Sequence, residues 1–305
     1  MTYDCAIIGG GPAGLNAALV LGRCRRHVVL FDNDDARNHV VRESHGFLTR
    51  DGICPSELRR LAHEELAAYP SVELHQDKVT AVKRLTETHY EVTTASALSF
   101  RCTKILLATG LKDEQPNVPG IERFYGTSLF SCPYCDGWEV RDKPLAVIAD
   151  KNVAKLAKEV FTWSRDLIVF TNGEGRLELD ERELLESYGI QVVEDIISGL
   201  EGRDGQLERV RLEDGTLIDR SFGFVTPLWS HGDHFAESLG CELNEYGGIK
   251  TDEYGRTNVW NVYAAGDTAN IVPAQLIVAA GSGSAAAIGI NGDLTNEFFG
   301  KPLPK

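Results

Sequence analysis

Short apolar runs alternate with amphipathic stretches along this chain, which is the pattern of an α/β protein. Near the start, an apolar run at 3–8 leads into glycines, an amphipathic stretch at 13–24 and a second apolar run at 27–31. This order predicts a strand, a helix and a parallel strand, which together form the βαβ unit of a nucleotide-binding domain.

A second βαβ unit is predicted about 140 residues later, where strands at 145–148 and 167–170 flank a helix at 152–163. Between the two units, residues 112–119 have the composition of a linker. We therefore expect an α/β protein with two Rossmann-like, three-layer ββα domains, the first of them discontinuous in sequence. The expected boundaries are 1–114 for the first part of one domain, 115–243 for the other domain, and 244–305 for the second part of the first.

The remaining segments complete both domains. A helix with a proline near its start is predicted at 55–69, and antiparallel strands are predicted at 72–83 and 89–94. Further along, we expect a strand at 104–108, a helix near 178–188, a strand at 190–193, a hairpin near 207–218, a strand at 260–264 and a long helix at 273–291.

The composition argues against several classes of partner. The chain has 305 residues, of which 43% are hydrophobic and 25% charged, so it has ample apolar material for two cores. Its formal net charge of −14 repels nucleic-acid backbones and anionic lipid, and we expect neither as a partner. No apolar run reaches transmembrane length and no signal peptide is visible, so the expected location is the cytoplasm.

The glycines after the first predicted strand match the pattern G-x-G-x-x-G. The residues of this loop are Gly9, Gly11, Pro12, Ala13 and Gly14. One glycine makes the tight turn, one admits a pyrophosphate at the helix N-terminus, and one lets the helix pack against the strand. Asp32 follows the second strand, 23 positions after Gly9 (32 − 9), close to the spacing expected for an acid that binds a ribose hydroxyl. The loop therefore predicts a bound dinucleotide.

Cys132 and Cys135, out of seven cysteines, are the pair close enough in sequence to act together. Two thiols at C-x-x-C spacing can close a small disulfide, and a helix N-terminus stabilises the thiolate form. Near a βαβ unit, this motif indicates thiol–disulfide exchange. A half zinc site and a purely structural pair are the alternatives, but zinc needs four ligands and no second C-x-x-C supplies them. We expect no metal site.

Three further motifs, taken with the glycine loop and the C-x-x-C, resemble those of the low-molecular-weight thioredoxin reductases, a family of flavoprotein disulfide reductases. They are Ala108-Thr109-Gly110, Gly266-Asp267 and Ala274-Gln275-Leu276. The resemblance covers nearly the whole chain and implies that FAD is the dinucleotide, bound by the discontinuous domain. It also implies that Asp267 hydrogen-bonds the ribityl chain and that the segment from Ala274 lies beside the flavin ring.

The same resemblance implies roles at the redox pair. Cys135 would face the flavin, Cys132 would exchange with an external thiol, and Asp136 would transfer protons. The alternative for Asp136 is an ordinary acidic residue at a helix N-terminus. The family further implies a homodimer, rotation of the middle domain, and a substrate that is a disulfide protein such as thioredoxin or a small dithiol.

The middle domain departs from the family where NADPH would bind. Ala149 and Lys151 stand in the places of the first two glycines, and Asp150 adds negative charge between them. The next strand ends in Thr171-Asn172-Gly173, which offers neither arginines for NADPH nor an acid for the ribose of NADH. We expect NADP(H) binding to be impaired or absent, and weak binding through other contacts is the alternative.

These features predict an FAD-dependent thiol–disulfide oxidoreductase from a nicotinamide-independent branch. Relatives of this kind include ferredoxin-dependent flavin thioredoxin reductases, diflavin-linked disulfide oxidoreductases with a second FAD, and oxygen-dependent dithiol oxidases. The acidic charge disfavours ferredoxin, and many of the oxidases have histidine where Asp136 stands. A conventional NADPH-dependent thioredoxin reductase and a non-catalytic FAD-binding sensor are the remaining alternatives.

Overall fold

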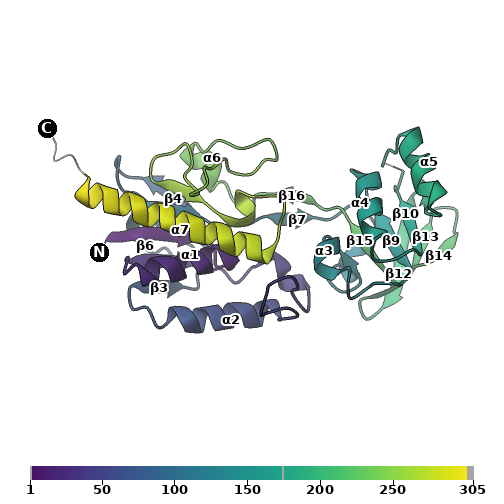
Figure 1. The fold of residues 1–305 in the computed structure, drawn as a ribbon, viewed down its shortest axis with the longest axis horizontal. Helices are drawn as coiled ribbons and strands as arrows, with labels where there is room; N and C mark the ends of the chain where they lie inside the picture. Colours follow the sequence, from purple (N-terminus) through teal and green to yellow (C-terminus); the bar gives the residue numbers. More distant parts are fainter. Residues whose placement is uncertain (1, 174, 301–305) are drawn as a thin grey trace. The chain divides into compact units, whose positions relative to one another are not determined.

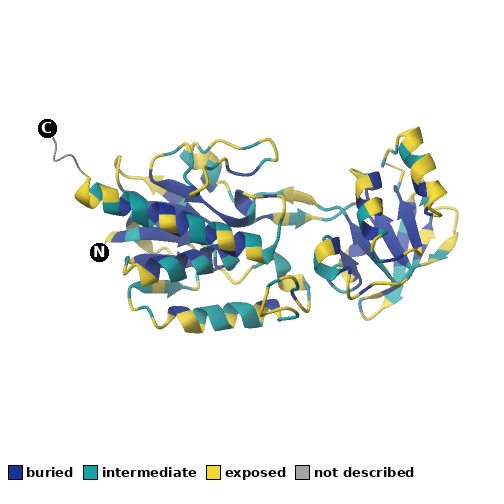
Figure 2. Cartoon of the chain, in the orientation of Figure 1, coloured by how far each residue is buried: buried dark blue, intermediate teal, exposed yellow. Residues whose placement is uncertain are grey.

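A computed structural model describes residues 2–173 and 175–300. The chain forms two compact units, each with its own sheet and hydrophobic cores. Unit 1 comprises Met1–His39, Gly46–Lys112 and His231–Lys305, and unit 2 comprises Val40–His45 and Asp113–Ser230. Figure 2 shows that buried residues concentrate on the strands of both units, while the outer faces of the helices are exposed.

Unit 1 is built on a seven-stranded sheet with the order β3-β2-β1-β6-β5-β4, and β17 pairs with β6. All its pairings are parallel except β4 with β5 and β5 with β6. The first two apolar runs form the central strands β1 and β2. Nearly every side chain of these strands is buried, because both faces of the sheet are covered. The strands are β1 (Thr2–Ile8), β2 (Val28–Phe31), β3 (Val72–His75), β4 (Val79–Arg84), β5 (Tyr90–Thr94), β6 (Ser99–Leu107) and β17 (Val262–Ala264).

Helices α1 (Pro12–Arg23) and α7 (Leu276–Phe299) pack side by side on one face of this sheet (Figure 1). Leu15, Leu21 and Ile290 of these helices share a core with side chains of β1 and β6. The two helices approach closely because Gly283 of α7 lies against the backbone of Ala13 in α1. The remaining helical segments are α2 (Pro55–Leu66), α6 (Phe235–Leu239) and the 3₁₀ turns η1 (Arg37–Val40) and η3 (Gly266–Thr268).

The expected antiparallel strand at 72–83 is confirmed over its second half and wrong over its first half. It forms two strands: β3, which runs parallel to β2, and β4, which runs antiparallel to β5. The break falls at Asp77, whose carboxylate accepts the backbone N–H of Lys78 at 2.8 Å. A side chain that bonds its own backbone favours a turn over a continuous strand.

Unit 2 contains a five-stranded parallel sheet with the order β11-β10-β9-β15-β8. Helix α4 (Val153–Val160) connects β9 to β10 and completes the second βαβ unit, with Leu156, Ala157 and Val160 buried. Helix α5 (Leu179–Ser187) precedes β11. The strands are β8 (Leu129–Phe130), β9 (Leu145–Ile148), β10 (Leu167–Phe170), β11 (Gln191–Val193) and β15 (Phe222–Val225).

A three-stranded antiparallel sheet, β12-β13-β14, shares a core with this parallel sheet. The hairpin of β13 (Gln206–Leu212) and β14 (Leu217–Asp219) was predicted, whereas β12 (Ile197–Arg203) was not. Where the chain passes between the units, β7 (Lys112–Glu114) pairs with β16 (Leu228–Ser230). The short elements η2 (Ile121–Arg123) and α3 (Pro133–Asp136) complete unit 2. The two parallel sheets with their helices confirm the predicted α/β class with two Rossmann-like folds.

Candidate redox and cofactor-binding site

The loop between β1 and α1 has no room for side chains at two of its motif glycines. Gly9 has φ of +117°, and a Cβ there would lie 2.1 Å from the carbonyl oxygen of Ala108. A Cβ on Gly14 would lie 1.9 Å from the carbonyl oxygen of Gly9, so α1 packs directly against the end of β1. At Gly11, by contrast, nothing lies within 4 Å of the Cβ position. The backbone is therefore open at the N-terminus of α1, where a pyrophosphate is bound in folds of this kind.

Asp32, at the end of β2, is held rigidly beside this loop. Its side chain is nearly buried, and a Cβ on Gly10 would lie 2.1 Å from its carboxyl carbon. Arg59 of α2 donates to Asp32 Oδ2 at 2.7 Å and also pairs with Asp34 at 2.7 Å. One helical turn further on, His63 Nε2 lies 3.3 Å from the same carboxylate oxygen. The sequence did not indicate Arg59 or His63, because nothing local in α2 shows that this face meets the end of β2.

The other cofactor motifs meet the same loop. A Cβ on Gly266 would lie 2.8 Å from the side chain of Ala13, and one on Gly283 would lie 2.0 Å from the Ala13 carbonyl oxygen. Thr109, which follows β6, bonds Thr268 through their hydroxyl groups at 3.3 Å. The segments that follow β1, β6 and β17 therefore meet near the start of α1, within unit 1.

Asp267 and Gln275 both belong to unit 1. Arg37 donates to Asp267 Oδ2 at 2.7 Å. Gln275 is the N-cap residue of α7, between Ala274 and Leu276, and its Oε1 lies 3.4 Å from the Cβ position of Gly46. Gly110, with φ of +68°, has nothing within 4 Å of its Cβ position.

The structure brings Asp32, Ala108, Thr109 and Gly266 together around the loop of Gly9, Gly11 and Gly14, and these residues fit a dinucleotide such as FAD. The fit rests on the open backbone at Gly11, on the free N–H groups at the start of α1 and on the fixed carboxylate of Asp32. The first two suit a pyrophosphate, and the third is placed to accept a ribose hydroxyl.

Cys132 and Cys135 form a disulfide, with Cα atoms 5.3 Å apart. Cys132 is the N-cap residue of α3, and its carbonyl oxygen accepts the backbone N–H groups of Cys135 and Asp136 at 3.1 and 3.2 Å. Both cysteines are half-buried, while Tyr134 and Trp138 expose 66% and 65% of their surface. The disulfide thus lies at the surface of unit 2 beside two exposed aromatic rings, within reach of an external thiol.

Asp136 follows the second cysteine and is half-buried. Burial raises the pKa of its carboxyl to about 7; the His45 imidazolium lowers this pKa and the Glu139 carboxylate raises it. A group with a pKa near the working pH can both accept and donate a proton. The sequence did not point to His45, because this residue lies in a segment far from the C-x-x-C motif along the chain.

The second nucleotide-type turn follows β9. A small cavity of about 30 Å³ at this turn is lined by residues 116–118, 148–150 and 171–172. A Cβ on Gly175 would lie 2.6 Å from the Ala149 carbonyl oxygen and 3.2 Å from Val153, so the chain after β10 lies directly against this turn.

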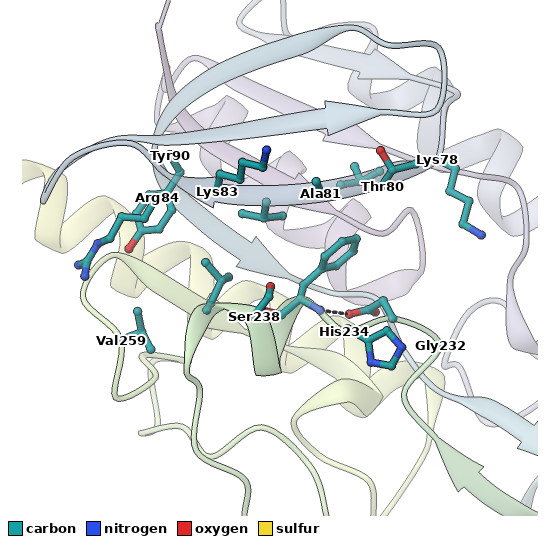
Figure 3. A pocket seen from close by; sticks show the side chains of 15 residues that line it. Lys78, Thr80, Ala81, Lys83, Arg84, Tyr90, Gly232, His234, Ser238 and Val259 are labelled. Carbon is teal, nitrogen blue, oxygen red and sulfur yellow. Dashed lines mark hydrogen bonds between the residues drawn. The ribbon is translucent and has the colours of Figure 1, made fainter.

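A separate cavity of about 880 Å³ lies between β4 and α6 of unit 1 (Figure 3). Its lining includes Val82, Tyr90 and Phe235, and none of the cofactor or redox residues named above. Among the described residues, no cluster of three histidine, cysteine, aspartate or glutamate side chains is arranged to hold a metal ion. No described helix is both long and apolar enough to cross a membrane.

Comparisons with known proteins agree with this geometry. Residues 3–283 match the family described as pyridine nucleotide-disulphide oxidoreductase. A putative thioredoxin reductase, TrxB from Bacillus anthracis, is 43% identical with a TM-score of 0.93, covering 97% of this chain and 99% of that one. HlmI is 34% identical with a TM-score of 0.93, covering 99% and 95% of the two chains. A probable thioredoxin reductase from Arthroderma benhamiae is 33% identical, covering 97% of this chain and 81% of that protein. The chain belongs to the pyridine nucleotide-disulphide oxidoreductase family and is a thioredoxin reductase-like, flavin-dependent enzyme.

Proposed function

We propose that this enzyme passes electrons between FAD and the Cys132–Cys135 disulfide without using NADPH. The observation that carries the proposal is the make-up of the turn after β9, where Ala149 and Lys151 stand in the places of the first two motif glycines. Side chains at these positions obstruct the close approach of a pyrophosphate to the backbone. Gly175 lies against the Ala149 carbonyl oxygen, so the chain after β10 lies beside this turn.

The charges at this turn also argue against NADPH. Asp150 would face a pyrophosphate with a like charge, and its Oδ1 already accepts from Thr226 at 3.4 Å. Asn172, at the end of β10, accepts the backbone N–H of Ile197 at 2.8 Å and so serves the fold. No arginine stands in Thr171-Asn172-Gly173 to bind a 2′-phosphate.

For the cofactor, we assign FAD to the loop that contains Gly9, Gly11 and Gly14. When bound, FAD supplies a two-electron carrier. Pro12 and Ala13 begin the helix whose N–H groups would hold the pyrophosphate, and Asp32 would accept a hydrogen bond from the ribose. Ala108, Thr109 and Gly110 with Gly266 would border the isoalloxazine and ribityl groups. Asp267 would bond the ribityl chain, and the segment Ala274-Gln275-Leu276 would lie beside the flavin ring. A second FAD is compatible with this proposal. Measuring the FAD content per chain of the purified protein tests whether it is present.

For the thiol chemistry, we assign Cys132 to the external thiol and Cys135 to the flavin, as in the family pattern. Asp136 exchanges protons with the thiols, since burial brings its pKa to about 7. Exchange proceeds through thiolate attack on a sulfur of the disulfide, and one dithiol delivers two electrons to the pair.

The proposed substrate is a disulfide protein of the thioredoxin kind or a small dithiol, acted on by a cytoplasmic homodimer. Relatives that are named thioredoxin reductases support a disulfide protein. The second electron partner of the flavin is ferredoxin, a second FAD or oxygen in this proposal. Each of the three can be supplied separately in a reconstituted assay.

The test is anaerobic stopped-flow absorbance of the oxidised protein mixed with NADPH or with dithiothreitol. We expect dithiothreitol to bleach the flavin band and NADPH at millimolar concentration to leave it unchanged for minutes. Fast bleaching by NADPH overturns the proposal and identifies a conventional NADPH-dependent reductase.

A double variant, Cys132→Ser with Cys135→Ser, is the control for the dithiol reaction. It retains the flavin loop and removes the disulfide, so dithiothreitol should no longer bleach the flavin at the wild-type rate. Equal bleaching in wild type and double variant would show that electrons bypass the cysteine pair, as expected of a non-catalytic FAD-binding sensor.

A further inference from the structure

Residues 40–45 form a short segment that packs with unit 2. The carbonyl oxygen of Val40 lies 2.5 Å from the Cβ position of Gly126, and Val41 packs against the core around α4. The segment ends at His45, whose side chain is only 14% exposed. His45 is therefore held against the same unit that carries the redox pair.

The His45 ring meets the acidic groups beside the disulfide. Its Nε2 lies 3.7 Å from Glu139 Oε1 and 3.7 Å from Glu43 Oε2. Glu139 stands three positions after Asp136, just beyond the end of α3. The charge of His45 lowers the pKa of the Asp136 carboxyl.

The charged groups around Asp136 can be assigned element by element. The segment at 40–45 contributes His45, which Glu43 faces, and the turn after α3 contributes Glu139. Arg141, in the same turn, places its guanidinium 4.0 Å from the centre of the Trp138 ring and donates to the Trp138 carbonyl oxygen at 2.5 Å. Within the described residues, His45 is the cationic group that lowers the pKa of Asp136, and Glu139 is the acidic group that raises it.

We propose that His45 is a positioning residue that, paired with Glu139, controls the ionisation of Asp136 during thiol exchange. The inference rests on the proposed use of Cys132 and Cys135 as an exchanging disulfide. A positive charge on His45 favours the carboxylate form of Asp136. Asp136 can then accept a proton near neutral pH although burial opposes its charge.

The proton is needed in the second half of the exchange. A substrate thiolate attacks Cys132 Sγ, the bond to Cys135 breaks, and Cys135 leaves as a thiolate. The second substrate thiol gives its proton to the Asp136 carboxylate and attacks the substrate sulfur of the mixed disulfide, which releases Cys132 as a thiolate. The dithiol loses two electrons and becomes a disulfide, and the cysteine pair gains both. One proton is then on Asp136, and the proton of the first thiol is in solvent.

The experiment measures how fast dithiothreitol reduces the oxidised, full-length holoprotein between pH 5.5 and 9.5 under anaerobic conditions. Flavin absorbance is followed, and acid quenching with alkylation counts the thiols of Cys132 and Cys135, so every reducing equivalent is detected. Rates are divided by the thiolate fraction of the reagent. Wild type should show an inflection near pH 7 that Asp136→Asn abolishes.

His45→Gln removes the cation, so the inflection should move upward by roughly one pH unit, the low end of the effect of an adjacent opposite charge. At pH 6 the corrected rate should fall about five- to tenfold, because one pH unit changes the carboxylate fraction about tenfold. At pH 9 it should match wild type. His45→Arg keeps a permanent cation and should hold the inflection at or below the wild-type value.

The matched control is His234→Gln, since His234 is an exposed histidine of unit 1 paired with Glu237. Its inflection should not move. An unchanged inflection in His45→Gln, a rate loss that is equal at pH 6 and pH 9, or an inflection that survives Asp136→Asn overturns the inference. Reduction of the flavin by NADPH would overturn the proposed electron route and leave this result untouched, so the two failures are distinguishable.

Discussion

At the scale of single residues, burial of Asp136 links the chemistry of the site to its stability. The folded protein raises the pKa of this carboxyl from 3.8 to about 7 because burial disfavours its charge. Between these two values the folded state keeps a proton that the unfolded chain has lost. The stabilisation from the protonated group is therefore complete below pH 3.8 and is lost as the pH rises through 7.

Asp136→Asn should remove this pH dependence, since an amide stays neutral throughout. The free energy of unfolding of the variant, relative to wild type, should rise by ~2–4 kcal/mol between pH 4.5 and pH 8. Urea unfolding of the oxidised proteins at several pH values measures this difference. A difference that stays constant over the range would contradict the assigned effect of burial.

Gly11 differs from the other loop glycines because its conformation and its surroundings both tolerate a side chain. Its φ of −78° is open to any residue, and nothing lies within 4 Å of its Cβ position. Gly11→Val should therefore fold but place its side chain in the space assigned to the pyrophosphate. We expect wild-type circular dichroism with at least a tenfold loss of FAD per chain, measured by absorbance after purification. A yellow variant at full occupancy would show that the cofactor lies elsewhere.

At the scale of elements, the contact between α1 and α7 fixes the part of unit 1 that forms the loop. Gly283→Ala would bring a Cβ within 2.0 Å of the Ala13 carbonyl oxygen, which belongs to backbone and cannot swing aside. We expect a loss of ~2 kcal/mol or more in the free energy of unfolding, measured by urea denaturation.

Gly281→Ala is the matched control on the same helix, because this glycine is exposed and has open space at its Cβ position. It should leave stability unchanged or raise it by ~0.5–1 kcal/mol through better helix propensity. Equal stability of the two alanine variants would mean that the helices can separate without cost, contrary to the packing described here.

Local patterns predicted some elements better than others. Helices α1, α4 and α7 have amphipathic or small-residue faces that the sequence shows directly, and each was predicted to within several residues. Strand β12 was missed because it contains Gly199 and Gly202, which lower strand propensity. Gly202 is required there because a Cβ would lie 2.0 Å from the Gln206 carbonyl oxygen. That close approach arises only when β12 pairs with β13, so the sequence of β12 alone does not show it.

At the scale of the whole molecule, the sequence identified the residues that carry recognisable spacing and missed those that act through distant contacts. The glycine loop and the C-x-x-C were visible as motifs. The contacts of Gly175 with Ala149, and of His45 with Glu139, join segments that no motif connects. The pattern at 145–154 predicts a poor nicotinamide site, and this stays a prediction.

Charge over the whole chain also bears on the choice of partner. The net charge of −14 is accompanied by Asp136, directly after Cys135, and by Glu139, just beyond α3, with Arg141 as a nearby cation. A negatively charged disulfide protein should therefore be repelled at low salt. Raising the ionic strength from 0.01 to 0.2 M shortens the Debye length from ~30 Å to below ~8 Å, and should speed that reaction several-fold.

Reaction with neutral dithiothreitol should change less than twofold over the same range, because no long-range force acts on an uncharged reagent. Stopped-flow rates at matched pH measure both reactions. A basic disulfide protein should show the opposite salt dependence and react more slowly as salt is added, since salt screens attraction and repulsion alike. If the reaction of an acidic protein substrate instead slowed with added salt, a local basic surface would have to dominate over the net charge.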